Sequence, residues 1–222
     1  MTQESFLGHL GGGGRETLSR QLVTRHYRRD EMVIAQDDDT RDVFFVLDGH
    51  ARATIYSANG KMVAYRDIHA GGIFGELSAI DGAPRSATVS ALDDLTVGRM
   101  TVGDFQGLIA TDPDFTMALL RYFTQQSRLM TERIFEFSTM LVRDRLVREL
   151  VRLAEEYEAA DGMVALTPAP THFDLAARIS THREAVSREM SRLAKLGLIS
   201  KSGGRLIVHD IGRLRAARAS RD

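Results

Sequence analysis

Cysteine and tryptophan are absent from the 222 residues, and proline occurs only four times. Without cysteine, no disulfide, thiol nucleophile, zinc–thiolate site or cysteine-held iron–sulfur cluster can form. The seven histidines do not replace it, because none falls at a spacing typical of metal ligands. The composition therefore predicts neither thiol chemistry nor a bound metal.

Long apolar runs are also missing, since none approaches the ~20 residues that a membrane span needs. The N-terminus has no basic region followed by an apolar core, so it does not resemble a secretory signal. We expect a cytoplasmic protein that does not enter the membrane. Residues 11–14 are all glycine, which predicts a flexible leader over residues 1–19.

The net charge of −1 is unevenly distributed along the chain. From residue 142 onward there are 15 Lys and Arg against 11 Asp and Glu, whereas the whole chain has 29 against 30. The C-terminal part is therefore modestly basic and the remainder acidic. This asymmetry favours a polyanionic partner for the C-terminal part only.

Short strand-like segments fill residues 26–100. The segment HARATIY alternates, with Ala51, Ala53 and Ile55 on one predicted face, and Asn59-Gly60 is a strong hairpin signal. Helical crossovers, which an α/β sheet would need, are not evident. We predict a small β-barrel or sandwich over residues 20–111.

A long helical stretch follows Asp112-Pro113, with no further Pro or Gly before Gly162. Its apolar positions step by three and four residues, as in a heptad seam: Leu120, Phe123, Ser127, Met130, Ile134, Phe137 and Leu141. Such a helix could pack on its own barrel, but its polar flanks favour a dimerisation helix over residues 112–141.

Residues 142–222 contain two helical patterns separated by a short turn at residues 179–181. Thr171 is a suitable N-cap, and Asp174 three positions later completes an acidic capping box. The predicted buried faces consist of Leu175, Ala176, Ile179, Val186, Met190, Leu193 and Leu196. The opposite face of the second helix carries Arg183, Glu184, Ser187 and Arg188, which could read DNA bases or simply be solvated.

The segment FGELSAIDGAPRSATV, residues 74–89, combines groups that suit a sugar phosphate. Gly75 permits close backbone approach, and the Glu76 carboxylate can accept from ribose hydroxyls. Arg85 offers a planar donor fork for a phosphate, with the Ser86 hydroxyl beside it. Spacing alone would equally allow a simple Glu–Arg ion pair.

This segment resembles the phosphate-binding cassette of cyclic-nucleotide-binding domains, with both its Phe-Gly-Glu-Leu opening and its Pro-Arg-Ser-Ala-Thr-Val close. The resemblance implies that Glu76 binds the ribose 2′-hydroxyl and that Arg85 and Ser86 bind the cyclic phosphate. It further implies help from backbone groups at Gly75, Leu77 and Ser78. Val63 and Ala64 would line the base pocket.

The C-terminal part resembles the winged helix-turn-helix of the CRP/FNR superfamily, whose recognition helix carries Arg-Glu-x-x-x-Arg. Here the motif falls on Arg183, Glu184 and Arg188, and a Gly-Gly hairpin follows. The resemblance implies a homodimer on double-stranded DNA, with TGTGA-like half-sites in an inverted repeat, and RNA polymerase as a further partner. Ser187 belongs to the same face, while Thr171 and His172 would contact phosphates.

Two positions depart from the family pattern. Ser180 stands in the inter-helix turn where the family often has Gly. Met130-Thr131 stands where the family has a Thr-Ser pair that reads adenine, so only Thr131 keeps a hydroxyl for the base. The resemblance therefore implies cAMP as the allosteric ligand, with cGMP as a close competitor.

These patterns predict an α+β protein: a jelly-roll-type cyclic-nucleotide-binding β-barrel, a long dimerisation helix and a winged helix-turn-helix. Its predicted function is nucleotide-gated binding to a palindromic DNA site. An alternative keeps the architecture but lacks the nucleotide or senses another ligand. An enzyme is not supported, because no Ser/His/Asp set, metal site or Walker-type loop is present.

Overall fold

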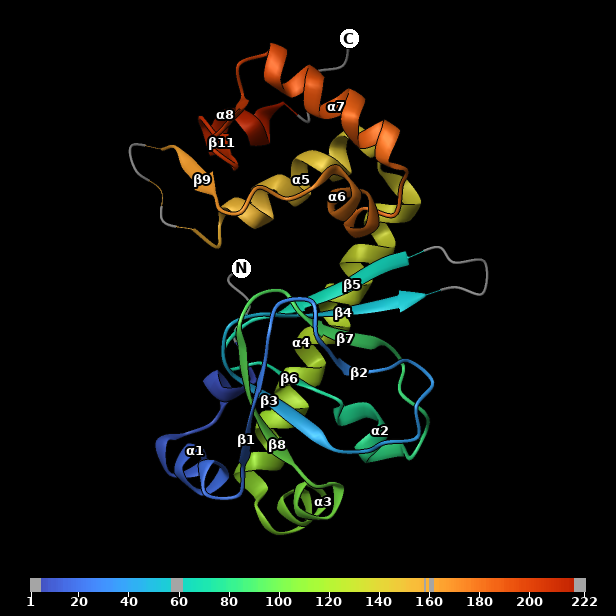
Figure 1. Ribbon diagram of the computed structural model, residues 1–222, viewed down its shortest axis with the longest axis vertical. Helices are drawn as coiled ribbons and strands as arrows, with labels where there is room; N and C mark the ends of the chain where they lie inside the picture. The colour runs from blue at the N-terminus through green and yellow to red at the C-terminus, as the bar shows by residue number, and fades with distance from the viewer. Residues whose placement is uncertain (1–4, 57–61, 158, 160–161, 218–222) are drawn as a thin grey trace. The chain divides into compact units, whose positions relative to one another are not determined.

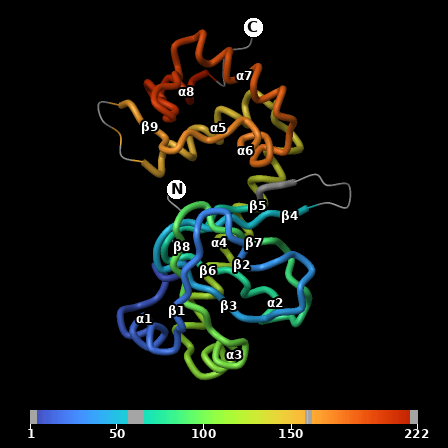
Figure 2. Tube along the Cα trace, viewed as in Figure 1, coloured from blue at the N-terminus to red at the C-terminus, as the bar shows by residue number. Residues whose placement is uncertain are grey.

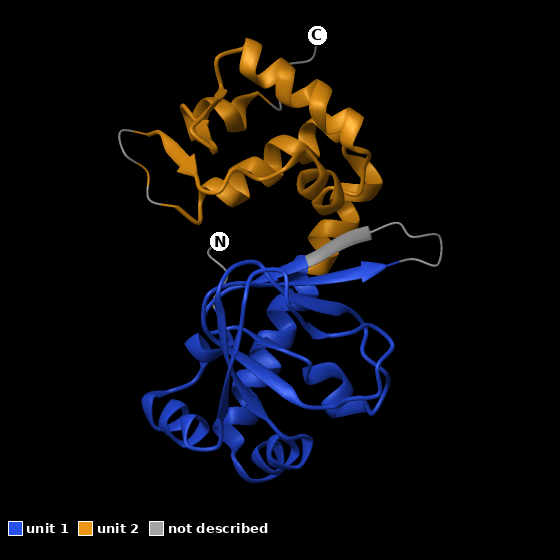
Figure 3. Cartoon of the chain, in the orientation of Figure 1, with its two compact units in different colours: residues 1–129 blue, residues 130–222 orange. Residues whose placement is uncertain are grey.

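The computed structural model of the protein describes residues 5–56, 62–157, 159 and 162–217, with residues 62–65 described by their backbone alone. The chain divides into two compact units, residues 1–129 and 130–222, and the division falls within one long helix (Figure 3). Among the described residues, no helix is both long enough and apolar enough to cross a membrane.

The first unit is built on two four-stranded antiparallel sheets. One has the order β1(Val23–Tyr27), β8(Leu95–Met100), β3(Val43–Asp48), β6(Ile73–Phe74). The other has the order β2(Met32–Ile34), β7(Thr88–Ala91), β4(Ala51–Tyr56), β5(Met62–Ile68). Strands distant in sequence are neighbours, as β1 and β8 show in Figure 2. The predicted Asn59-Gly60 turn lies outside the described residues.

The two sheets share an apolar core to which strands of both contribute. Phe44 of β3 and Phe74 of β6 stack with ring centroids 5.1 Å apart, and Val89 and Val97 are buried beside them in the same cluster. Burying such side chains stabilises the fold by about 1.5–3 kcal/mol each. This core explains why short strands with alternating apolar residues form a stable sandwich.

The expected flexible leader is wrong for residues 5–19. These residues form a short 3-10 helix, Phe6–His9, and helix α1(Gly12–Ser19). Phe6 is fully buried and packs against Phe45, Phe115 and Tyr122, and its neighbour Leu7 donates its N–H to the Gly71 carbonyl. Burial of Phe6 together with Leu10 and Leu18 opposes the helix penalty of about 1 kcal/mol that each glycine carries.

Three further helices complete the first unit and continue into the second: α2(Glu76–Asp81), α3(Val102–Thr111) and α4(Pro113–Thr139) (Figure 1). The N-terminal part of α4 packs Phe115, Ala118, Leu119 and Tyr122 into the cluster around Phe6. Helix α4 ends at Thr139, so Leu141 lies outside it and is instead the N-cap residue of the next helix. The predicted seam is therefore helical only as far as Phe137.

Strand β4 does not alternate along its whole length as predicted. Ala53 pairs with Arg66 of β5 but Thr54 pairs with Ala64, so Tyr65 is an extra residue, as in a β-bulge. Thr54 is buried and Ile55 is 38% exposed, contrary to its predicted place beside Ala51 and Ala53. Ile55 lies one residue beyond the last residue of β4 that pairs with β7, which is Thr54 opposite Thr88.

The second unit continues from α4 with one small sheet and four helices. Its elements are α5(Val142–Ala154), β9(Val164–Leu166), α6(His172–Arg178), α7(Arg183–Lys195), β10(Ile199–Ser202), β11(Arg205–Val208) and α8(Ile211–Ala216). Helices α6 and α7 form the predicted helix-turn-helix, and β10 and β11 form the predicted hairpin. Strand β9, which the sequence analysis did not predict, adds a third strand beside β11.

Local signals in this unit are satisfied. Thr171 caps α6 and forms the capping box with Asp174. Ser180, in the turn before α7, has a φ of 51°, which is the left-handed conformation that the family's glycine suits. The expected buried position of Leu196 is wrong: this residue is the C-cap of α7 and is half exposed, while Leu198 is buried instead.

Candidate ligand pocket and helix-turn-helix surface

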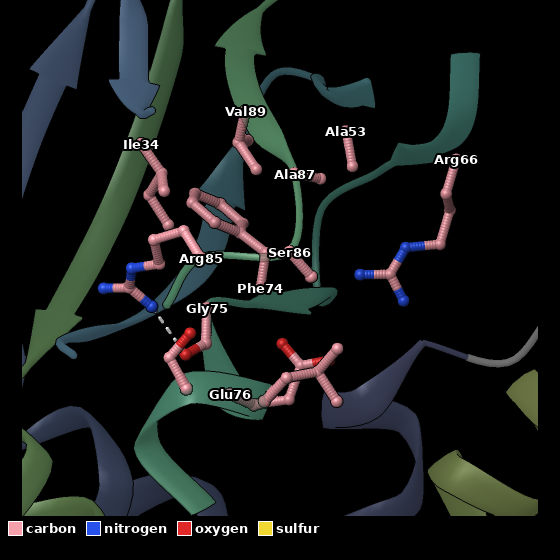
Figure 4. Close-up of a pocket in the computed structure, with 12 residues that line it drawn as sticks. Ile34, Ala53, Arg66, Phe74, Gly75, Glu76, Arg85, Ser86, Ala87 and Val89 are labelled. Atoms are coloured by element: carbon pink, nitrogen blue, oxygen red, sulfur yellow. Dashed lines mark hydrogen bonds between the residues drawn. The ribbon is translucent and has the colours of Figure 1, made fainter. Parts of the chain in front are cut away.

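A pocket in the first unit gathers the central residues of the cassette. It encloses about 440 Å³ of space, part of which is open to solvent. Its polar lining includes Arg66, Glu76, Ser78, Arg85 and Ser86 (Figure 4). The rest of the lining is formed by Ile34, Ala53, Phe74, Gly75, Leu77, Ala87 and Val89.

Arg85 is buried and its guanidinium is fixed by three bonds to the protein. It donates to Thr40 Oγ1 at 3.1 Å and to the carbonyls of Gly75 and Asp42, each at 2.8 Å. A guanidinium has five N–H donors, so three are used in holding the fork in place. The burial of Arg85 lowers its pKa, and nearby Asp42, Asp38 and Glu76 oppose that shift. The result is a pre-oriented cation with donor capacity left for an anion.

Gly75 allows the backbone to turn sharply at the start of α2. Its φ is +82°, and a Cβ at this position would lie 2.8 Å from both Arg85 Nη1 and the Asp42 carbonyl oxygen. Any side chain would therefore disturb the arginine as well as strain the backbone. This glycine is required by the packing of the pocket itself.

Glu76 places a buried carboxylate in the same pocket. Burial raises its pKa, and the positive charge of Arg66, the bond to its own backbone and the charge of Arg85 act in the opposite direction. Two arginines thus flank one acidic group, and they lie on opposite sides of it in Figure 4. The simple Glu76–Arg85 ion pair that spacing allowed is not the arrangement here, because Arg85 bonds to a hydroxyl and two carbonyls.

The structure therefore brings together Gly75, Glu76, Leu77, Ser78, Arg85 and Ser86, as predicted. The side chains of Val63 and Ala64 lie outside the described part of the chain. Thr131 lies on α4 in the second unit, has an exposed side chain and does not line the pocket.

Arg66 is a pocket residue that the sequence analysis missed. It pairs across the sheet with Ala53, so both side chains lie on the face that lines the pocket. Arg66 and the buried Ile68 share a face of β5, because the pairing with β4 is regular from Ile68 opposite Ala51 to Arg66 opposite Ala53. The two-residue spacing of Arg66 and Ile68 in the segment MVAYRDI was the signal that could have placed Arg66 on the inner face.

In the second unit, α7 presents a polar face. Arg183, Glu184 and Arg188 are exposed on it, as predicted, whereas Val186, Met190 and Leu193 are buried in the core of the unit. Ser187 is half buried, because its hydroxyl lies 2.8 Å from His172 Nδ1 of α6. This contact ties the first residue of α6 to the second turn of α7.

The two predicted phosphate contacts are engaged within the unit. The Thr171 hydroxyl donates to Asp174 Oδ2 at 2.6 Å. Burial lowers the pKa of His172, and the neighbouring charges of Lys201 and Arg183 lower it further. His172 contacts Ser187 Oγ through Nδ1 at 2.8 Å and Lys201 Nζ through Nε2 at 3.4 Å, so both of its ring nitrogens are engaged within the unit.

Two family models match the chain, one in each unit. Residues 24–112 match the cyclic nucleotide-binding domain, and residues 144–217 match the Crp-like helix-turn-helix domain. Together they cover most of the chain, in the order that the fold shows. The protein is a ligand-responsive transcription regulator with a DNA-binding helix-turn-helix, and not an enzyme.

The chain belongs to the CRP/FNR family. It is 22% identical over 198 residues to a CRP-like cAMP-activated global transcriptional regulator of Mycobacterium tuberculosis, covering 89% of this chain and 88% of that one. The structure of FixK2 from Bradyrhizobium japonicum matches with a TM-score of 0.76 at 20% identity, covering 90% and 99% of the two chains. The c-di-GMP responsive regulator CLP of Xanthomonas campestris matches with a TM-score of 0.77 at 19% identity, covering 89% and 99%.

Proposed function

We propose that the pocket binds a cyclic purine mononucleotide, cAMP or cGMP, and that this binding gates recognition of DNA. The observation that carries the proposal is the joint burial of Glu76 and Arg85 around one small pocket that also contains Ser86. Arg85 and Ser86 bind the cyclic phosphate, with backbone groups at Gly75, Leu77 and Ser78. Glu76 accepts from the ribose 2′-hydroxyl.

The DNA-binding part of the proposal rests on the exposed polar face of α7. Arg183 and Arg188 suit guanine, because a guanidinium can donate to O6 and N7 together, and Glu184 suits the cytosine amino group. Ser187, Thr171 and His172 position this helix against the backbone of the duplex. We further propose that two copies of the chain bind an inverted repeat of TGTGA-like half-sites in the cytoplasm. RNA polymerase is the further partner of this complex.

Calorimetric titration of the full chain with cAMP and with cGMP tests the pocket. Arg85→Ala removes the main phosphate partner and should cost about 2–5 kcal/mol of binding free energy. Because Arg85 also bonds to Thr40, Gly75 and Asp42, Arg85→Lys should be measured alongside it, with thermal unfolding as the check of the fold. Arg25→Ala is the matched control, since Arg25 is an exposed arginine of β1 outside the pocket lining.

Unchanged affinity in a folded Arg85 variant would place the nucleotide elsewhere. A second candidate function is a regulator of the same architecture that responds to a different effector. Met130 favours this function, because its side chain cannot donate a hydrogen bond to a base. The absence of binding by both mononucleotides would support that candidate.

A further inference from the structure

Three of the described residues that line the pocket are charged: Arg66, Glu76 and Arg85. The proposed contacts to phosphate and ribose use Arg85 and Glu76 but give no role to Arg66. It pairs with Ala53 of β4, and both residues lie on the face of the sheet that lines the pocket. Its guanidinium donates to the Tyr122 hydroxyl and, at 2.9 Å, to the Ile73 carbonyl. The guanidinium carbon also lies 5.7 Å from the centroid of the Tyr122 ring, a cation–π contact. These contacts hold the side chain in one orientation.

The position of Arg66 relative to the cassette matters more than its charge. In Figure 4, Arg85 and Arg66 lie on opposite sides of the pocket, and Glu76 lies between them. In a cyclic nucleotide the ribose separates the phosphate from the base, and the 2′-hydroxyl lies next to the carbon that bears the base. If Arg85 binds phosphate and Glu76 the 2′-hydroxyl, the base end of the ligand faces Arg66. This step rests on the proposed function.

We propose that Arg66 reads the six-position edge of the bound purine and favours guanine over adenine. A guanidinium offers only donors. Guanine presents two acceptors on this edge, O6 and N7, whereas adenine presents N7 beside an amino group that is itself a donor. An adenine edge therefore places a donor against a donor, and a guanine edge accepts from Arg66. The preferred ligand is cGMP, by about tenfold.

Arg66 also has a simpler role, because its positive charge favours the ionised form of Glu76. That role concerns only the ribose contact, which is the same in both nucleotides. Loss of Arg66 through this effect alone would weaken cAMP and cGMP equally. The ratio of the two affinities therefore separates base reading from a supporting charge.

The test is calorimetric titration of the full chain with cGMP, cAMP and cyclic IMP. Cyclic IMP has the O6 and N7 acceptors but lacks the 2-amino group of guanine, so it should bind like cGMP and more tightly than cAMP. This comparison uses the unaltered protein and does not depend on whether a variant folds. Binding of cyclic IMP at the affinity of cAMP or below would overturn the proposal.

Arg66→Met and Arg66→Lys extend the test. Methionine removes the donors and should reduce the cGMP-to-cAMP affinity ratio about tenfold, mainly through cGMP. Lysine keeps the charge but not the fork, and should restore only part of the ratio. Arg25→Met is the matched control and should leave the ratio unchanged. If the Arg66 variants lose the same factor of affinity for cGMP and for cAMP, the base-reading role of Arg66 is overturned but the proposed function is not. If the unaltered protein binds neither nucleotide, the proposed function is overturned as well.

Discussion

At the scale of single residues, Glu149 of α5 is the most constrained charge in the second unit. Its carboxylate is fully buried and lies 2.9 Å from Arg133, 2.5 Å from Arg152 and 3.1 Å from Arg178. Glu136 of α4 is also buried and shares Arg133 and Arg152. This network ties residues of three helices of the unit, α4, α5 and α6, to one buried acidic pair.

We predict that stability falls at acid pH through Glu149. Burial raises its pKa, but Arg133, Arg178 and Arg152 outweigh that effect, so its folded pKa lies below the unfolded one. Its stabilising contribution is therefore complete above the unfolded pKa and disappears as pH falls through the folded value. Thermal unfolding followed from neutral to acid pH measures this loss.

The matching variant is Glu149→Gln, which leaves the arginines without their buried partner and should cost about 3 kcal/mol at neutral pH. The substitution should also reduce the loss of thermal stability as pH falls from neutral to acid values. Glu189→Gln is the control, because Glu189 pairs with Arg192 nearer the surface and such pairs contribute about 0–1 kcal/mol. Equal effects of the two substitutions would contradict the assignment.

At the scale of elements, the turn between α6 and α7 determines how the helix-turn-helix closes. Ser180 has a φ of 51° there, a conformation that costs a residue with a Cβ roughly 1 kcal/mol. Ser180→Gly should relieve this strain and stabilise the protein by about 0.5–1 kcal/mol, despite the greater freedom of glycine in the unfolded chain.

Urea unfolding of the full chain measures this change. Ser191→Gly is the control, because Ser191 lies in the interior of α7, where glycine should destabilise by up to about 1 kcal/mol. The two serine-to-glycine changes are thus expected to have opposite signs. A destabilised Ser180→Gly variant would show that the turn carries no strain.

At the scale of the whole molecule, exposed apolar residues on α4 suggest a second copy as partner. Leu120 is 54% exposed, Ile134 66% and Phe137 36%, and all three belong to the predicted heptad seam. An apolar row left in water is unfavourable, and a self-complementary contact would bury it in a two-fold dimer. We therefore expect Ile134→Glu combined with Phe137→Glu to produce monomers.

Sedimentation of the full chain measures assembly, with Ser138→Glu as the control at an exposed position off the seam. Selection from a random DNA pool in the presence of nucleotide should return inverted repeats with half-sites about 34–36 Å apart, and the doubly substituted chain should not bind them. A monomeric parent, or selected sites without dyad symmetry, would refute this assembly.

The sequence by itself determined the features whose signals are local. The cassette from Gly75 to Ser86 is continuous, and its two ends, residues 75–78 and 85–86, line one pocket. The Thr171–Asp174 capping box, the helix-turn-helix and the Gly203-Gly204 hairpin each depend on residues a few positions apart. Such patterns act through hydrogen bonds and backbone preferences that operate before distant parts of the chain meet.

Only the tertiary structure decided the features that depend on contacts between residues far apart in the sequence. Phe6 is buried only because β3 and α4 provide Phe45, Phe115 and Tyr122, so a glycine-rich segment became part of the core. Arg66 lies in the pocket because β5 pairs with β4 in the register that places it opposite Ala53, and Ile55 is exposed because it lies beyond the last β4 residue that pairs with β7. A sheet's register is set by the summed pairing and burial of two strands, and that sum cannot be read from either strand alone.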